Sequence, residues 1–278
     1  MSEPLVSVLL PVHGGVEPAF LRECLDSLLA QTRRADEVIV VQDGPLEFEH
    51  DHALDVFERD HSGVCRVRLQ KNQGAGIANR TGLLVASGRW IAKVDADDIC
   101  HPSRFERQLD AVQRAGVDLC GAAMLEFVDD PSHVVSRRSM PLTHEAVVRR
   151  LPWNNPINHP TAFYRRETAL ARGGYPTWRH MQDYGLFALM IADGAIAMNL
   201  PDDLVYFRSG RTMLGRRRGR QFLELELSLQ LLLVNQRIVG RPQMLLNLIW
   251  RLAYRFLPRR VMSVLHNRAL ARPGQCNG

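Results

Sequence analysis

The chain has 278 residues, of which 46% are hydrophobic, so it can bury a sizeable core and is not a disordered protein. Its 35 Lys and Arg outnumber its 30 Asp and Glu, and the excess lies late in the sequence. This distribution predicts a nearly neutral body with a basic tail, which is either a solvated face or a contact for the phosphates of a lipid, a nucleic acid or a substrate.

Features of secretion and of membrane spanning are not evident in the sequence. The five Cys are scattered without the paired spacing of a zinc site or a disulfide framework, which fits a reducing compartment. The first residues carry Glu3 in place of a basic region, and no uncharged apolar stretch reaches 18 residues. We therefore expect a cytoplasmic protein with no secretory signal and no spanning helix.

The first part of the chain, to about residue 125, alternates short β-branched runs with helical patterns, which predicts βα units around a mainly parallel sheet. Strands are expected at 6–10, where Pro11 ends the strand, and at 38–41, 64–69 and 90–94; helices are expected at 21–29 and 77–86. Ligands bind at the carboxyl ends of strands in such sheets. Residues 11–14, 43, 72–76 and 95–98 should therefore converge on one crevice.

The pattern of predicted strands and helices is less regular in the second part of the chain. A helix is expected at 103–115, a strand at 117–124, loops of an acceptor side at 129–160, a helix at 181–192 and a short strand at 204–207. From residue 221 onward leucine-rich helical segments follow, interrupted by Gly240, Pro242 and Pro258.

Three carboxylates, Asp95, Asp97 and Asp98, directly follow an apolar strand. Burying so much like charge is costly, so the group should be either solvated or neutralised by a cation. Asp95 and Asp97 project to the same side of an extended segment, which suits a hard divalent ion, although acidic surface loops are also common. We expect no side-chain cation nearby to take the place of that ion.

Several ordered blocks of sequence resemble family 2 glycosyltransferases of the GT-A fold, over about residues 5–210. The blocks are VSVLLPVHGG, CLDSLLAQT, EVIVVQDGP, KNQGAGIANRTGLLVASGRWIAKVDADD, NHPTAFYRRETALARGGY and MQDYGLFALMIADG. The resemblance implies an α/β, Rossmann-like fold with a mainly parallel sheet flanked by helices. It implies a catalytic domain at 1–215, with a nucleotide-binding half (1–125) and an acceptor half (126–215), and a helical extension at 216–278.

The resemblance also implies roles for particular residues. Asp95 and Asp97 would hold Mn²⁺ or Mg²⁺ on the donor diphosphate, and Asp183 would be the base of an inverting displacement. The donor nucleotide would contact Pro11, Val12, His13, Asp43, Asn72, Gly74, Asp95 and Ala96. The chain departs from the family pattern at Gln42, at Asn79-Arg80 and at Gln182.

Other candidate residues have more than one interpretation. His159 is a third metal ligand, a contact for acceptor or diphosphate, or a structural loop residue, and Gln182, Arg208 and Arg211 are candidates for acceptor or phosphate binding. Asp43 can accept a hydrogen bond from a pyrimidine imide, which favours a uridine donor, or can simply form a turn.

Three other functions were weighed against glycosyl transfer. The run from Gly74 to Asn79 resembles a dinucleotide fingerprint, but its third glycine is missing and it lies in the third βα unit. A sugar-1-phosphate nucleotidyltransferase should carry a cation in a glycine-rich first loop, which residues 11–15 lack. A non-catalytic membrane-associated module is the third alternative, and the presence of Asp95, Asp97 and Asp183 together disfavours it.

The sequence pattern of the C-terminal tail predicts a basic amphipathic helix at the membrane interface. One face carries Leu245, Leu248, Ile249, Leu252 and Phe256, and another carries Arg251, Arg255 and Arg259. The alternative is a helix packed on the body or in a dimer. We expect an enzyme at the inner face of the cytoplasmic membrane, with a nucleotide-sugar donor, a saccharide or polyprenyl-diphosphate-linked acceptor and no nucleic acid partner; the sequence leaves the oligomeric state open.

Overall fold

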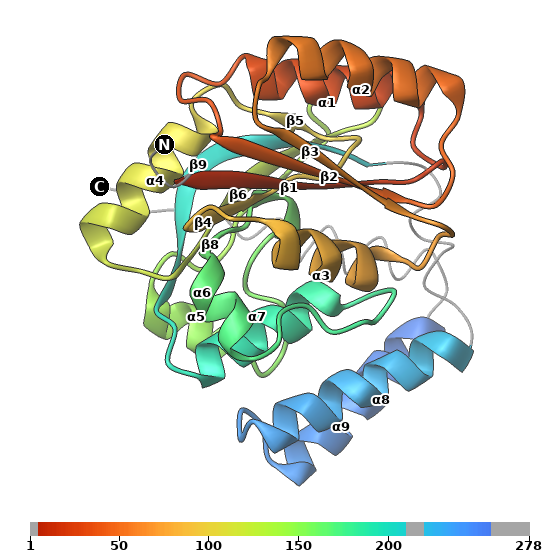
Figure 1. The fold of residues 1–278 in the computed structure, drawn as a ribbon. Coiled ribbons are helices and arrows are strands. Elements are labelled where there is room, and N and C mark those ends of the chain that lie inside the picture. The colour runs from red at the N-terminus through yellow and green to blue at the C-terminus, as the bar shows by residue number, and fades with distance from the viewer. Residues whose placement is uncertain (1–4, 210–219, 257–278) are drawn as a thin grey trace.

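The computed structural model describes residues 5–209 and 220–256, and within these ranges nine strands form one sheet (Figure 1). The strand order is β3-β2-β1-β4-β8-β6-β9-β5, with β7 paired to β6. The parallel part consists of β1 (Val6–Val12), β2 (Glu37–Asp43), β3 (Val64–Leu69) and β4 (Trp90–Lys93). The expected α/β fold with a mainly parallel sheet is confirmed.

The rest of the sheet mixes strand directions. It consists of β5 (Ile99–Cys100), β6 (Leu119–Phe127), β7 (Ser136–Arg138), β8 (Phe163–Arg165) and β9 (Ala197–Arg208). The short strand β8 is antiparallel to both β4 and β6, whereas β6 and β9 are parallel. The sheet therefore runs without a break from the first 125 residues into the part of the chain that follows them.

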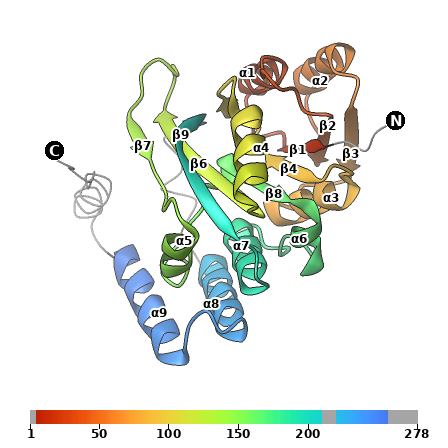
Figure 2. The ribbon, with the colours of Figure 1, turned by 90° about the vertical axis from the view of Figure 1, so that its left-hand side faces the viewer.

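Helices cover both faces of the sheet (Figure 2). One face carries α1 (Pro18–Leu29), α2 (Phe48–Asp60) and α4 (Arg104–Ala115). The other carries α3 (Ala75–Val85), α5 (His144–Arg150), α6 (Arg166–Ala171) and α7 (Gln182–Ala192). Because both faces are buried, β1 and β2 are continuous apolar runs, which is why they were recognised in the sequence.

Two local predictions were wrong, and one helix was missed. Strand β1 continues through Pro11, which pairs with Val41 after the pairing with β4 has ended at Leu9, so the missing proline N–H breaks no β1–β4 ladder. Helix α2 was not predicted. Strand β9 has 12 residues in place of the short strand at 204–207, because register shifts opposite Ala123 accommodate the irregular segment that contains Pro201.

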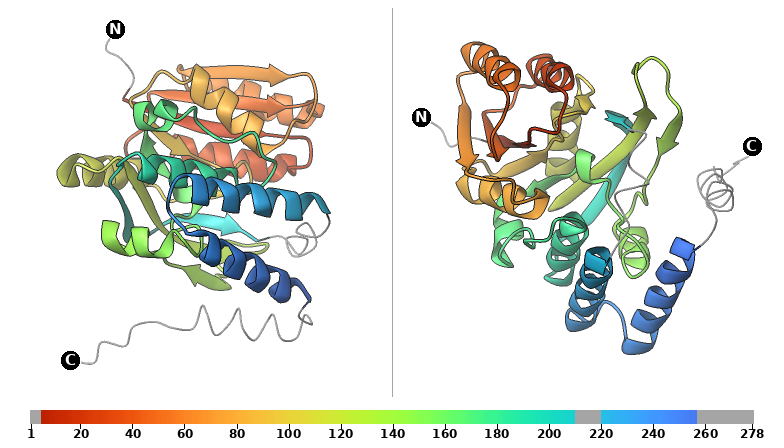
Figure 3. Two further views of the ribbon diagram at one scale, coloured as in Figure 1. Left: turned by 90° about the horizontal axis from the view of Figure 1, so that it is seen from below. Right: turned by 90° about the vertical axis from the view of Figure 1, so that its right-hand side faces the viewer.

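Helices α8 (Arg220–Asn235) and α9 (Arg241–Phe256) form an antiparallel pair beside α7 and α5 (Figure 3). Leu229 and Leu233 of α8 are buried against Tyr184 of α7. The expected interruption near Gly240 and Pro242 separates α8 from α9, and Pro242 lies in the first turn of α9, where a proline is tolerated. In the part of the chain that the structure describes, no helix is long and apolar enough to cross a bilayer.

The expected arginine face of the tail helix needs correction. Arg251 points inward, where it pairs with Glu226 of α8 at 2.7 Å and donates to the carbonyl of Trp153 at 3.0 Å. The side chains of Leu252, Arg255 and Phe256, and Arg259 altogether, lie outside the described residues. Arg251 is thus a structural contact between α9, α8 and the loop after α5.

Candidate active site

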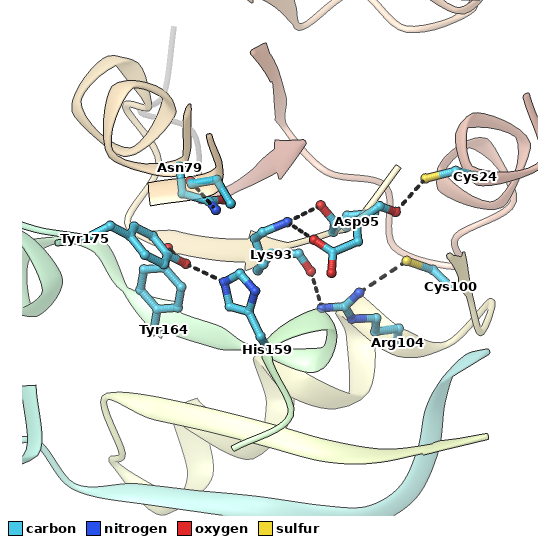
Figure 4. Close-up of polar contacts among 11 residues, drawn as sticks. Cys24, Asn79, Lys93, Asp95, Cys100, Arg104, His159, Tyr164 and Tyr175 are labelled. Carbon is cyan, nitrogen blue, oxygen red and sulfur yellow. Dashed lines mark hydrogen bonds and ion pairs between the residues drawn. The ribbon is translucent and has the colours of Figure 1, made fainter. Parts of the chain in front are cut away.

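The loop after β4 holds the carboxylate cluster, and it begins beside a buried ammonium group. Lys93 is fully buried, and its Nζ lies 2.5 Å from Asp95 Oδ1 and 2.5 Å from the carbonyl of Val94 (Figure 4). The expectation that no side-chain cation lies near the cluster was therefore wrong. Lys93 neutralises Asp95, and a charged residue inside the apolar run Trp90–Lys93 is the signal that could have revealed it.

The three carboxylates experience different electrostatic environments. Burial alone would raise the pKa of Asp95, but the charge and hydrogen bond of Lys93, together with the charge interactions of His159 and Arg104, outweigh it, so the pKa of Asp95 is lowered. Burial and the neighbouring Asp95 charge raise the pKa of Asp97. Burial also raises the pKa of Asp98 well above its usual value, and its Oδ2 atom is buried without a hydrogen-bond partner.

Asp98 and Arg208 tie this loop to β9. Asp98 Oδ1 accepts a hydrogen bond from the Arg208 backbone N–H at 2.9 Å, and Arg208 Nε donates to the Asp97 carbonyl at 3.0 Å. The Arg208 guanidinium also contacts Glu23 and lies over the rings of Phe20 and Phe127. These contacts favour a structural role for Arg208 over the expected phosphate contact. Arg211 lies outside the described residues.

The residues at this loop fit a hard divalent ion. Burial and the neighbouring Asp95 disfavour the ionised form of Asp97, which a cation would stabilise, and the buried Asp98 Oδ2 has no hydrogen-bond partner. Carboxylate oxygens are the ligands that Mg²⁺ and Mn²⁺ prefer. Over residues 5–209 and 220–256 no group of three or more His, Cys, Asp or Glu side chains is arranged to hold a metal. His159 therefore does not complete a protein metal cage with Asp95 and Asp97, and further ligands would have to come from the substrate or water.

His159 lies between the carboxylate loop and two buried tyrosines (Figure 4). It begins the 3₁₀ turn His159–Thr161, and its Nε2 lies 3.2 Å from the Tyr175 hydroxyl, which in turn accepts from Tyr164 at 3.0 Å. Burial lowers the pKa of His159, while the charges of Asp183 and Asp95 act in the opposite direction. The imidazole is thus near both carboxylates and is neutral at pH 7.

Asp183 lies in the first turn of α7, where the helix dipole favours a carboxylate. Its Oδ2 accepts a hydrogen bond from Asn155 Nδ2 at 2.7 Å, which fixes the orientation of the side chain. The preceding Met181 has a left-handed φ of 61°, a conformation that few non-glycine residues adopt and that is frequent at functional sites. Gln182 is buried, with its Oε1 unpaired.

The carboxyl end of β2 forms the other edge of the crevice. The buried Asp43 accepts hydrogen bonds from the backbone N–H groups of Gln73 at 2.6 Å and Gly74 at 2.9 Å. A carboxylate has about four lone-pair sites, so acceptor capacity for a nucleobase remains. Asp43 therefore shapes the loop at 72–74 as well as the end of its own strand.

A second loop, which contains Arg179, packs against the loop at 72–74. The guanidinium of Arg179 donates to the side chain and the carbonyl of Asn72 at 3.2 and 3.1 Å. A Cβ at Gly74 would lie 2.7 Å from Arg179 Cγ, and one at Gly76 would lie 2.2 Å from the Trp178 carbonyl. Both glycines are needed for this approach. Arg179 was not singled out in the sequence, since its contact spans 107 residues and leaves no local signal.

The remaining predicted donor residues lie at the end of β1 and in the carboxylate loop. Pro11 and Val12 end β1, His13 is exposed and accepts from the Gly15 N–H at 2.9 Å, and Ala96 is buried. Because β1 lies between β2 and β4, the ends of these three strands meet at one edge of the sheet. Asp43, Asp95 and Asp97 therefore lie at the edge of the sheet where ligands bind in folds of this kind.

Comparisons with known proteins agree with this geometry. The model of a family described as "Glycosyl transferase family 2" matches residues 7–174. The amylovoran biosynthesis glycosyltransferase AmsE of Erwinia amylovora is 32% identical, over 95% of this chain and 98% of that protein. An Escherichia coli enzyme named UDP-Gal:alpha-D-GlcNAc-diphosphoundecaprenol beta-1,3-galactosyltransferase is 26% identical, over 97% of this chain and 98% of that protein.

A solved structure shows the same fold. The mannosyltransferase PcManGT from Pyrobaculum calidifontis, in complex with GDP-Man and Mn²⁺, superposes with a TM-score of 0.63 and 18% identity, over 96% of this chain and 80% of that chain. At this identity the likeness concerns the fold, which is the expected GT-A-like one.

Proposed function

Because the chain belongs to glycosyl transferase family 2, we propose that it transfers a sugar from a nucleotide donor, of which a UDP-sugar is the favoured class, during assembly of a surface polysaccharide or oligosaccharide. The names of the two bacterial relatives support a role of this kind. We assign the activity to residues 1–215, with donor binding in 1–125 and acceptor binding in 126–215, followed by the extension at 216–278.

The donor occupies the crevice at the ends of β1, β2 and β4. Asp43 accepts from the base, and the loop at 72–74 lies beside it. Asp95 and Asp97 would hold Mn²⁺ or Mg²⁺, and such an ion would supply stabilisation of the negative charge that develops on the leaving diphosphate. Lys93 holds the Asp95 carboxylate in place, so that one oxygen is oriented before the donor arrives.

The acceptor hydroxyl must lose its proton as it attacks the anomeric carbon. Asp183 is the proposed base, with Asn155 holding its carboxylate, and one base with one direct displacement gives inversion at the anomeric carbon. The neutral His159 contacts acceptor or diphosphate between the two carboxylate groups, with Tyr175 fixing the ring. Gln182 lines the same side.

The acceptor is proposed to be a saccharide, free or carried on a polyprenyl diphosphate, as in the name of the Escherichia coli relative. A polyprenyl chain stays in the bilayer, so the protein would work at the inner face of the cytoplasmic membrane.

The observations that best support this function are the position of Asp95 and Asp97 directly after β4 and the electrostatic interaction of His159 with both Asp95 and Asp183. The test is a thermal-shift and UDP-release screen with UDP-sugars and Mn²⁺. Wild type should be stabilised and should release UDP, and excess EDTA should abolish both effects.

Two variants make the screen specific. Asp95→Asn should lose metal-dependent stabilisation, whereas Asp110→Asn, an exposed carboxylate on α4, should behave as wild type. Undiminished UDP release in EDTA would refute the metal assignment. Absence of any response to nucleotide sugars would refute the proposed donor.

A further inference from the structure

Helix α9 turns a row of large apolar side chains toward solvent. Leu245, Leu246, Ile249 and Trp250 are between 55% and 67% exposed, and their spacing places them on one side of the helix. We call this set the α9 apolar face. The opposite side of α9 is packed, since Asn247 is buried and bonded to Gln230 of α8 at 3.0 Å and to the Pro152 carbonyl at 2.9 Å. The exposed row therefore lies on the side of α9 that faces away from these contacts.

Charge in the sequence is segregated around this helix. Residues 211–278 contain 13 Arg and two Glu, a net charge of +11, whereas residues 1–210 contain 22 Lys and Arg against 28 Asp and Glu, a net charge of −6. No Asp or Glu follows Glu226. The apolar face thus belongs to a part of the chain whose partner should be anionic.

The combination of apolar and basic character selects the kind of partner. A second copy of the same face would bring two strongly cationic segments together, which is unfavourable. A nucleic acid offers phosphates but no apolar layer to receive three aliphatic side chains and an indole. An anionic lipid surface offers both, and Trp is favoured at the boundary between headgroups and acyl chains.

The α9 apolar face and Asp183 belong to one packed unit. Leu229 and Leu233 join α8 to Tyr184, the residue after Asp183. Arg251 of α9 donates to the carbonyl of Trp153, an exposed residue two positions before Asn155, which holds Asp183. A surface that binds α9 therefore lies in a defined position relative to the proposed base.

We infer that the α9 apolar face docks on a bilayer containing anionic lipids. This docking presents Asp183 to a lipid-carried acceptor, a step that rests on the proposed function. The tail helix lies in the interface through its leucines and Trp250. Arg251 serves the protein contact, and the net positive charge of this part of the sequence favours an anionic surface.

The test is flotation of the full-length protein with vesicles of phosphatidylcholine alone or with added phosphatidylglycerol, at low and high salt. Leu246→Glu removes apolar contact and adds a negative charge, and Leu84→Glu is its matched control on α3, with 60% and 56% of the two leucines exposed. We expect wild type and Leu84→Glu to float with anionic vesicles. Leu246→Glu should bind at least about tenfold more weakly, with an unchanged melting temperature.

Three results would overturn the inference. The first is failure of wild type to bind anionic vesicles at low salt, and the second is equal binding by wild type and Leu246→Glu. The third is a concentration-dependent dimer, seen in light scattering, that Leu246→Glu abolishes; this result would make a second copy of the chain the occupant of the α9 apolar face. Transfer to a short-chain, water-soluble acceptor should be the same in wild type and Leu246→Glu. Failure of transfer in both would count against the proposed function and leave the vesicle result standing.

Discussion

Replacing Lys93 by Met tests whether the carboxylate loop depends on its buried cation. Lys93 is fully buried, and its Nζ lies 2.5 Å from an Asp95 carboxylate whose side chain is 32% exposed. Removing one partner of a buried ion pair typically costs about 3–5 kcal/mol. Because water can reach part of Asp95, we expect the lower end, about 3 kcal/mol of unfolding free energy. Met matches the length of the lysine stem, so little of the loss should come from a cavity.

The assay is urea denaturation at pH 7 of four proteins: wild type, Lys93→Met, Asp95→Asn and the double variant. The double variant should be more stable than Lys93→Met, because no uncompensated charge is left in it. Adding Mn²⁺ with UDP should restore more stability to Lys93→Met than to the double variant, since the ion replaces the missing positive charge at Asp95. A loss below about 1 kcal/mol in Lys93→Met, or equal losses in Lys93→Met and the double variant, would refute the reasoning.

Other predictions concern the base, its support and a histidine far from the site. Asp183→Asn should lower turnover at least about a hundredfold while UDP affinity in Mn²⁺ changes little, and near-normal turnover at saturating acceptor would identify another base. Asn155→Ala should lower turnover less than Asp183→Asn, because the carboxylate remains but loses its 2.7 Å partner; steady-state kinetics on both variants would show the opposite order if Asn155 were itself the essential group. His61 accepts from the Gly63 N–H at Nδ1, so its Nε2 donates to the Ala35 carbonyl, and burial lowers its pKa below 6.5. The unfolded chain then binds the proton more readily, so this contribution to stability is full above about pH 6.5 and is lost as the pH falls through the folded pKa. His61→Gln should lose less stability than wild type between pH 7.5 and 5.5 in urea titrations, and identical pH dependence would contradict this assignment.

Much of the fold followed from patterns that a single sequence carries. The strands that form the parallel core and helices α1, α3, α4 and α7 have either continuous apolar runs or a regular helical period. Strand β8, with three residues held between β4 and β6, is too short to show a period and exists only because of its neighbours. Helix α2 buries His50 among its apolar positions, which weakens its amphipathic pattern.

Some residues of the candidate site could likewise be predicted from the sequence, and others could not. Asp43, Asp95 and Asp97 follow predicted strands, so their convergence at one sheet edge could be expected before the structure was known. Asn155 and Tyr175 were missed, because their relation to Asp183 and His159 arises from loops that only the folded chain brings together. Arg208 was a candidate for phosphate binding, and the packing of Phe20 and Phe127 around its guanidinium, which the sequence does not reveal, favours a structural role.

The most direct test of the proposed mechanism is the anomeric configuration of the first product, measured by proton NMR with a UDP-sugar, Mn²⁺ and a saccharide acceptor. Direct displacement assisted by Asp183 predicts a product whose anomeric configuration is opposite to that of the donor, formed by wild type and not by Asp183→Asn. A product that retains the donor configuration, or an inverted product formed equally fast by Asp183→Asn, would contradict the account.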